Sequence, residues 1–250
     1  MTVNTAGGTK NIAIGNYSLD ALTSGDYNVA VGYNALTANT TAEGNTAIGY
    51  TALEDNTTGT SNVAVGAYAL ANSTTAAGNV AVGVSALQTN TTGATNTAVG
   101  KDAMVNSTTG ANNVSIGSIS LAANTTGSRN TAIGAESMND NTTADNNTAI
   151  GYASLSKNTT GTSNTAIGWA ALEVNTTASN NVAVGHAAAR SNTTGTRIIA
   201  IGYGALDGQD TENDNIAIGY NTMTTNNAGG EENIMIGSYA GDAITSGDSN

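Results

Sequence analysis

Few residues in this 250-residue chain could carry out acid–base or nucleophilic chemistry. His186 is the only histidine, no cysteine is present, and the acidic residues recur in no paired register. A histidine without an acidic or thiol partner at a fixed spacing completes no Ser-His-Asp set, and a chain without thiols forms no disulfide or thiolate metal site. The sequence therefore predicts a protein that is not an enzyme and that uses no metal or cofactor.

Two polar or aromatic motifs recur without indicating catalysis. Asn-Thr-Thr matches the N-glycosylation pattern many times, but its regular return at turn positions favours a structural role. Aromatic residues often follow a repeated glycine, where contact with a cell-surface glycan or receptor and packing against a neighbouring chain remain open alternatives. These aromatic residues are Tyr33, Tyr50, Tyr152, Trp169, Tyr203 and Tyr220.

Charge and hydropathy exclude two classes of partner. Six basic against eighteen acidic residues, a net charge of -12, argue against binding to nucleic-acid phosphates. No apolar run approaches the ~20 residues of a membrane span, so no membrane insertion is expected. The chain starts at Met1 without a charged and then apolar leader, so no signal peptide is visible.

A fixed period of 17 residues organises the chain. Glycine marks its phase, with twelve spacings of 17 residues followed by one of 18. The phase glycines are Gly15, Gly32, Gly49, Gly66, Gly83, Gly100, Gly117, Gly134, Gly151, Gly168, Gly185, Gly202, Gly219 and Gly237. Each period, called a rung below, is too short for a helical hairpin, and a repeat of this kind is buried only by its neighbours.

The local pattern of each rung indicates β structure. A stretch such as residues 79–83, Asn-Val-Ala-Val-Gly, alternates β-branched with small residues and ends in a turn glycine. We therefore predict an all-β, parallel β-solenoid of about fourteen rungs, each with two short strands and two turns. Residues 1–10 are predicted to be a partial N-terminal rung, and residues 11–250 a single continuous domain.

Alternation along the first strand suggests a thin core. Ile or Val precedes every phase glycine, and Leu or Met lies four residues after it in twelve rungs. We expect these two columns, with the position two residues before each Ile or Val, to face inward. The predicted core column is Ile14, Val31, Ile48, Val65, Val82, Val99, Ile116, Ile133, Ile150, Ile167, Val184, Ile201, Ile218 and Ile236.

Alanine lies between the two expected inward positions in twelve rungs, with Ser115 and Met235 as departures. An outward column of alanine would suit a flat face pressed against copies of the same chain, whereas a crowded turn that admits only a methyl group is the alternative. The predicted self-association stripe contains Ala47, Ala64, Ala81, Ala98, Ala132, Ala149 and Ala166. The expected partners are therefore other copies of the chain, in a homotrimer or a filament.

Asparagine opens thirteen of fourteen rungs, with Ile198 as the exception, and paired threonines form two further columns. Stacked asparagines can form amide ladders along the solenoid. Regular threonine columns suggest an alternative function, ice binding. Adjacent threonines on a strand face opposite ways, which argues against that alternative.

The two ends of the sequence resemble one another. Residues 4–28 and 226–250 are identical at 16 of 25 positions, and Asn250 stands where another rung would open. Without an atypical cap, strand edges at the ends of a solenoid recruit other chains. We therefore expect the solenoids to stack end to end, or to be one module of a longer fibre.

The phrase Asn-Thr-Ala-Ile-Gly-x-x-Ala-Leu-x-x-Asn-Thr-Thr-Gly, seen at residues 45–59, resembles the repeats of bacteriophage tail-fibre and related tail-fibre-domain proteins. Its Asn-x-Ala-Ile-Gly portion is similar to the head repeats of trimeric autotransporter adhesins. The resemblance covers residues 11–250. It implies a left-handed parallel β-roll, a homotrimer, and an extracellular role as a fibre shaft or adhesin on a virion or cell surface.

Overall fold

The structure is a computed structural model, and it describes residues 8–208, 211–224, 230–242 and 247–248. The described residues contain three-residue β-strands and turns, and no helix. The chain divides into two compact units, residues 1–127 and 128–250. Most of the predicted partial rung at residues 1–10 lies outside the described residues, and the expected single domain stays a prediction.

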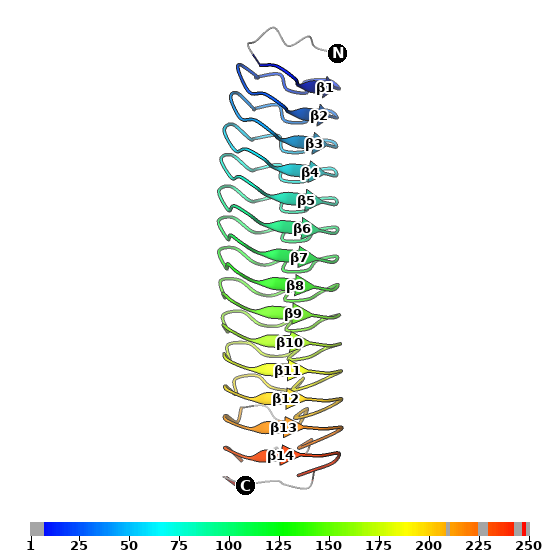
Figure 1. Cartoon of the computed structure of the whole chain (residues 1–250), viewed down its shortest axis with the longest axis vertical. Coiled ribbons are helices and arrows are strands. Elements are labelled where there is room, and N and C mark those ends of the chain that lie inside the picture. Colours follow the sequence, from blue (N-terminus) through cyan, green and yellow to red (C-terminus); the bar gives the residue numbers. More distant parts are fainter. Residues whose placement is uncertain (1–7, 209–210, 225–229, 243–246, 249–250) are drawn as a thin grey trace. The chain divides into compact units, whose positions relative to one another are not determined.

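Each unit is a parallel β-solenoid built from one strand per rung (Figure 1). The first unit contains β1 (Ile12–Ile14), β2 (Val29–Val31), β3 (Thr46–Ile48), β4 (Val63–Val65), β5 (Val80–Val82), β6 (Thr97–Val99) and β7 (Val114–Ile116). The second contains β8 (Thr131–Ile133), β9 (Thr148–Ile150), β10 (Thr165–Ile167), β11 (Val182–Val184), β12 (Ile199–Ile201), β13 (Ile216–Ile218) and β14 (Ile234–Ile236).

Successive strands within each unit pair in parallel and place equivalent residues side by side. Ala47 of β3 faces Ala64 of β4, and Ala166 of β10 faces Ala183 of β11. The single 18-residue spacing does not shift the strand register, because Ala217 of β13 is still paired with the middle residue of β14, Met235. The predicted fold class is confirmed, whereas the left-handed sense implied by the resemblance stays a prediction.

The second strand expected in each rung is replaced by a turn segment that alternates in backbone conformation. Its residues two and four after the phase glycine are left-handed, as at Tyr68 (φ 61°) and Leu70 (φ 51°). A left-handed leucine costs about 1–2 kcal/mol. Complete burial of its side chain contributes about 1.5–3 kcal/mol, and the Leu70 amide also donates to Ala86 of the next rung at 3.0 Å.

The phase glycines are required by the close approach of consecutive rungs. Gly49 has a φ of +144°, and a Cβ on it would lie 2.5 Å from the carbonyl oxygen of Gly66. That separation is impossible for a real side chain, so only glycine permits the backbones to stack at this corner.

The predicted core column is wrong by one residue. In most strands the middle residue is buried and its two neighbours are partly exposed; Ile48, for example, is 40% exposed and Ala47 is 0% exposed. Along a strand with a period of two, an error of one residue exchanges the inward and outward faces. The residues corrected from core to the outer face are Ile14, Val31, Ile48, Val65, Val82, Val99, Ile116, Ile133, Ile150, Ile167, Val184, Ile201, Ile218 and Ile236.

The predicted alanine stripe therefore lies inside the solenoid and cannot be a self-association surface. Ala47, Ala64, Ala81, Ala98, Ala132, Ala149 and Ala166 are all 0% exposed. Beside them in the core stand the leucine and methionine column, which confirms that part of the prediction, and an alanine or serine column three residues after the phase glycine.

Two exceptional rungs show which columns meet across the interior. Ser120 lies three residues after the phase glycine Gly117. Ser115, in the alanine column, donates a hydrogen bond from its hydroxyl to the carbonyl of Ser120 at 2.8 Å. Met235 replaces alanine in β14, and in that rung Gly241 replaces leucine. A Cβ on Gly241 would lie 2.9 Å from Cγ of Met235. The interior is therefore filled from both sides, and a large residue on one side requires a small residue on the other.

Candidate functional site: the exposed strand face

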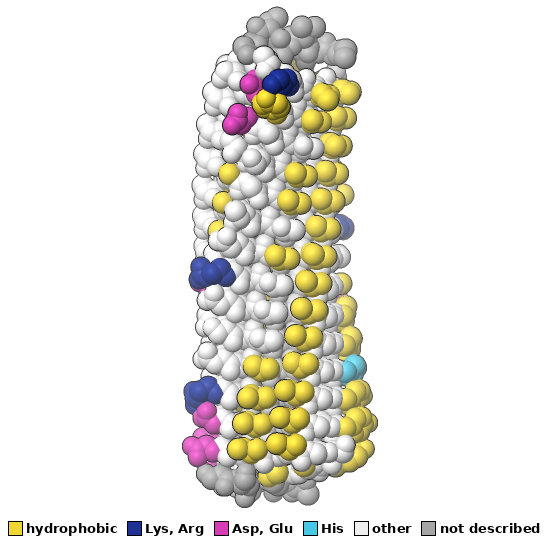
Figure 2. Space-filling model, in the orientation of Figure 1, with side chains coloured by type: hydrophobic (Ala, Val, Ile, Leu, Met, Phe, Trp, Pro, Cys, Tyr) yellow, Lys and Arg dark blue, Asp and Glu magenta, His cyan; other side chains and the backbone are white. Residues whose placement is uncertain are grey.

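The outer side chains of each strand form an apolar surface, called the strand face below. It consists of the first and third residues of β1–β7 in the first unit and of β8–β14 in the second. All of these residues are Val, Ile or Thr, and none carries a charge. In Figure 2 hydrophobic side chains along the strands of each unit appear yellow, and the yellow is interrupted where threonine replaces valine or isoleucine.

The exposure of the strand face is unusual for β-branched residues. Ile14, Ile116 and Ile201 are 54%, 39% and 38% exposed, and every other third-position residue is exposed or half-buried. Contiguous apolar patches of more than a few hundred Å² are uncommon on monomeric proteins and mark contact surfaces. The alternation places this surface outward because the leucine and methionine column fills the interior from the other side and leaves room for little more than alanine at the middle position of most strands.

A ladder of buried asparagines supports the strand from inside. The amide N–H of Asn62 donates to Oδ1 of Asn45 at 2.9 Å, and its Nδ2 donates to the carbonyl of Ala76 at 2.8 Å. In the second unit the same bonds run from Asn147, which donates to Asn130, as far as Ile198, whose amide N–H donates to Oδ1 of Asn181 at 3.0 Å. The expected amide ladder is thus present in both units.

The glycosylation motifs belong to the same buried system. Asn56 opens an Asn-Thr-Thr motif but is 0% exposed, and its Nδ2 donates to the carbonyl of Gly59 at 2.9 Å. The first threonine of the motif, Thr57, donates its hydroxyl to the carbonyl of Thr74 at 3.1 Å. The second threonine of each pair is exposed, so each rung that carries a pair contributes one exposed threonine to a column along the solenoid.

The chain's only histidine is part of an aromatic stack. The His186 ring lies between Trp169 and Tyr203, with centroid distances of 4.5 Å and 4.8 Å. The described residues contain no group of three His, Cys, Asp or Glu side chains that could hold a metal ion. The prediction that the chain is not an enzyme is not tested by this arrangement and stays a prediction.

Several charged side chains outside the strand face form ion pairs between rungs. Arg197 lies 2.6 Å from Asp214, and the side-chain hydrogen bond between them raises the pKa of Arg197 and lowers that of Asp214. Arg129 and Asp145 pair likewise at 2.7 Å. These pairs are exposed, so each contributes little to stability.

Two features of the surface escaped the sequence interpretation. The sequence pattern predicts outward alanines, although the paired exceptions Met235 and Gly241 indicate that their two columns face each other. The aromatic residues two positions after the glycine, Tyr17, Tyr68 and Tyr239, were not grouped with those one position after it, although the structure stacks both sets together.

The part of the chain that the structure describes holds no helix with the length and hydropathy of a membrane span. No protein-family model, curated protein or solved structure matches the chain. The repetitive β-solenoid itself fits a structural role, and its most prominent surface is the uncharged strand face.

Proposed function

We propose that the chain is a structural and adhesive fibre segment in which copies of the chain pack side by side through the strand face. The observation that carries this proposal is the exposure of the Ile and Val column in both units, with no charge in the strand face. Burying such a surface contributes about 25 cal/mol per Å² of apolar area. A second copy offers the same flat, uncharged surface and is therefore a complementary partner.

A homotrimer is the assembly that we propose. Three strand faces turned toward one axis would cover one another in a closed arrangement, as closed symmetry favours. The resemblance of residues 45–59 to fibre and adhesin repeats also implies three chains. The extracellular location, on a virion or a cell surface, is part of the proposal and rests on that resemblance.

Sedimentation of charge variants tests the proposal. The variant Val82→Glu with Ile116→Glu places two carboxylates on the strand face, whereas Val84→Glu places one on an exposed residue outside it. We expect the unmodified chain and Val84→Glu to sediment as trimers, and the double variant to sediment as a folded monomer with an unchanged circular dichroism spectrum. A stable monomer of the unmodified chain would contradict lateral assembly.

End-to-end stacking is a separate part of the proposal. It is supported by the repetition of residues 4–28 in residues 226–250, many of which lie outside the described residues. Electron micrographs of concentrated chain should show filaments of variable length. Particles of one uniform short length at every concentration would contradict it, while leaving lateral assembly to be judged by sedimentation.

Neither rival binding function is favoured by a specific observation. For ice binding, the second threonine of each pair is exposed, but the hydroxyls of first threonines such as Thr57 and Thr74 are committed to backbone carbonyls of the next rung, so each pair adds to a single exposed column and forms no Thr-x-Thr array. For glycan binding, the nearly parallel pairs Tyr33 with Tyr50 and Tyr203 with Tyr220 turn ring faces toward each other, and these are faces on which sugars would otherwise lie. Thermal hysteresis of the purified chain should therefore be absent.

A further inference from the structure

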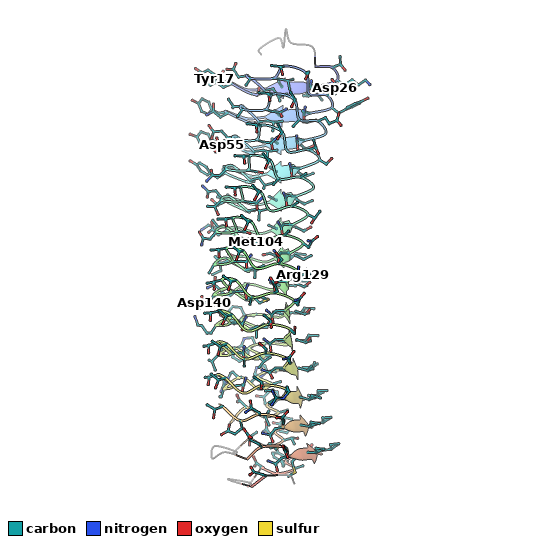
Figure 3. All side chains as sticks on the ribbon, turned by 90° about the vertical axis from the view of Figure 1, so that its left-hand side faces the viewer. Tyr17, Asp26, Asp55, Met104, Arg129 and Asp140 are labelled. Carbon is teal, nitrogen blue, oxygen red and sulfur yellow. The ribbon has the colours of Figure 1, made fainter. Side chains whose placement is uncertain are left out.

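Two aromatic ladders run along the corner that follows the strands. The first ladder, in the first unit, is Tyr17, Tyr33, Tyr50 and Tyr68. The second, in the second unit, is Trp169, His186, Tyr203, Tyr220 and Tyr239. Figure 3 shows the labelled Tyr17 at the side of its rung opposite Asp26. Neither ladder belongs to the strand face, from which the phase glycines separate it.

Five pairs of tyrosine rings are in contact within these ladders. Their centroids are 5.2–5.7 Å apart. Tyr33 with Tyr50 and Tyr203 with Tyr220 are nearly parallel, with interplanar angles of 9° and 14°. All seven tyrosines of the ladders are 41–58% exposed. A small diffusing oxidant can therefore reach phenols that already lie beside a second phenol.

Two further tyrosines provide an internal comparison. Tyr27 and Tyr152 are 56% and 47% exposed but have no tyrosine ring in contact. The ammonium group of Lys10 lies over the Tyr27 ring, 4.4 Å from its centroid. For Tyr152, the negative charge of the Glu136 carboxylate raises the pKa of the phenol. Exposure is thus matched between the two sets, and Tyr27 and Tyr152 lack the second phenol that each ladder tyrosine has beside it.

We propose that the aromatic ladders are sites of oxidative cross-linking, in which a peroxide acting through a haem peroxidase joins tyrosines of successive rungs within one chain. Each of two phenols gives one electron and its hydroxyl proton, and the two tyrosyl radicals form one carbon–carbon bond between ring carbons beside the oxygens. The hydrogens on those carbons then move to the oxygens, restoring both phenols. The pair loses two hydrogen atoms in total, and one hydrogen peroxide is reduced to two waters.

The solenoid favours coupling within the chain over coupling between chains. Parallel pairing of β2 with β3 and of β12 with β13 fixes neighbouring tyrosines one strand spacing apart, about 4.8 Å. Groups held in this way react as if at very high concentration, because the entropy of bringing them together has already been lost on folding. Each cross-link would tie two rungs together and resist their separation.

The test is oxidation of dilute, purified chain with hydrogen peroxide and a haem peroxidase. We expect dityrosine fluorescence, a monomer band on a denaturing gel, and a mass lower by two hydrogen atoms per cross-link. Peptide mapping should place cross-links between members of the five contacting pairs, and none at Tyr27 or Tyr152. Cross-linked multimers without any mass loss in the monomer, or cross-links at Tyr27 and Tyr152 as frequent as in the ladders, would overturn the proposal.

Phenylalanine variants separate ring stacking from phenol chemistry. Replacing Tyr33, Tyr50 and Tyr220 by Phe keeps the rings in place but removes at least one phenol from each of the five pairs. We expect the dityrosine yield of this triple variant to be lower by about tenfold or more, because no two phenols are then held in contact within the described part of the chain. The control variant Tyr27→Phe with Tyr152→Phe should keep the full yield, and equal yields from the two variants would overturn the assignment. Both variants should keep the circular dichroism spectrum of the unmodified chain.

Discussion

The two sides of each strand differ in a way that reverses the usual arrangement of a protein. Ala149 is 0% exposed inside the solenoid, while its neighbour Ile150, with a much larger apolar side chain, is 36% exposed. The reason is the width of the interior, which the leucine column fills from the opposite side. A thin solenoid therefore selects inward residues by size, and hydrophobicity alone does not identify its core.

The largest expected effect comes from placing a charge on each side of one strand. Ala149→Glu buries a carboxylate without a partner, which costs several kcal/mol, and we expect the surrounding rungs to unfold. Ile150→Glu points the same group outward and should leave the chain folded. Urea unfolding followed by circular dichroism measures both variants. Equal destabilisation would mean that the two sides of the strand are not distinct.

Removing bulk from the leucine column should give the next largest effect. Leu87 is fully buried, and Leu87→Ala should lower the free energy of unfolding by about 2–5 kcal/mol. Val84 in the same rung is 47% exposed, so Val84→Ala should change it by less than about 0.5 kcal/mol. Equal losses of unfolding free energy for Leu87→Ala and Val84→Ala in urea titrations would contradict the distinction between inner and outer residues.

Exchanging the exceptional pair in the last described rung sharpens the comparison further. Met235→Ala alone removes the side chain that fills the space beside Gly241, and Gly241→Leu alone brings its side chain against Met235, whose Cγ would be only 2.9 Å from the new Cβ. The double variant restores the arrangement of the other rungs. We expect a favourable coupling of about 0.5–3 kcal/mol, measured from hydrogen exchange of the β14 amides. Additive effects would show that the two positions do not share the interior.

The sequence predicts the period, the parallel stacking, the leucine column and the asparagine ladder, because each rests on residues that recur at one position. It did not predict which side of the strand faces inward. Val80-Ala81-Val82 alternates equally well in either sense, and the choice depends on how much space the opposite turn leaves. That space depends on the left-handed backbone conformation of residues such as Leu87 (φ 55°). The repeat pattern in the sequence does not indicate this conformation.

The smallest expected effect concerns the outward ion pair of Arg197 and Asp214. Its hydrogen bond holds the pKa of Asp214 below the unfolded value of about 3.9. The folded state then binds fewer protons than the unfolded state near that pKa, so the stabilisation is present at neutral pH and is lost as pH falls through the folded pKa. Stability of the unmodified chain and of Arg197→Gln should differ slightly at neutral pH and converge in acid. A difference that grows on acidification would contradict this sign.

The most direct measurement of the central claim is the reactivity of single cysteines on the two sides of one strand. The chain has no cysteine, so Ala81→Cys and Val82→Cys each introduce one thiol, and Val84→Cys supplies an exposed reference outside the strand face. Thiol labelling is followed in dilute chain shown by sedimentation to be monomeric. We predict that Cys variants of Val82 and Val84 react readily and that the Ala81 variant reacts only after denaturation. Rapid labelling of the Ala81 variant in the folded chain, together with protection of the Val82 variant, would contradict the account.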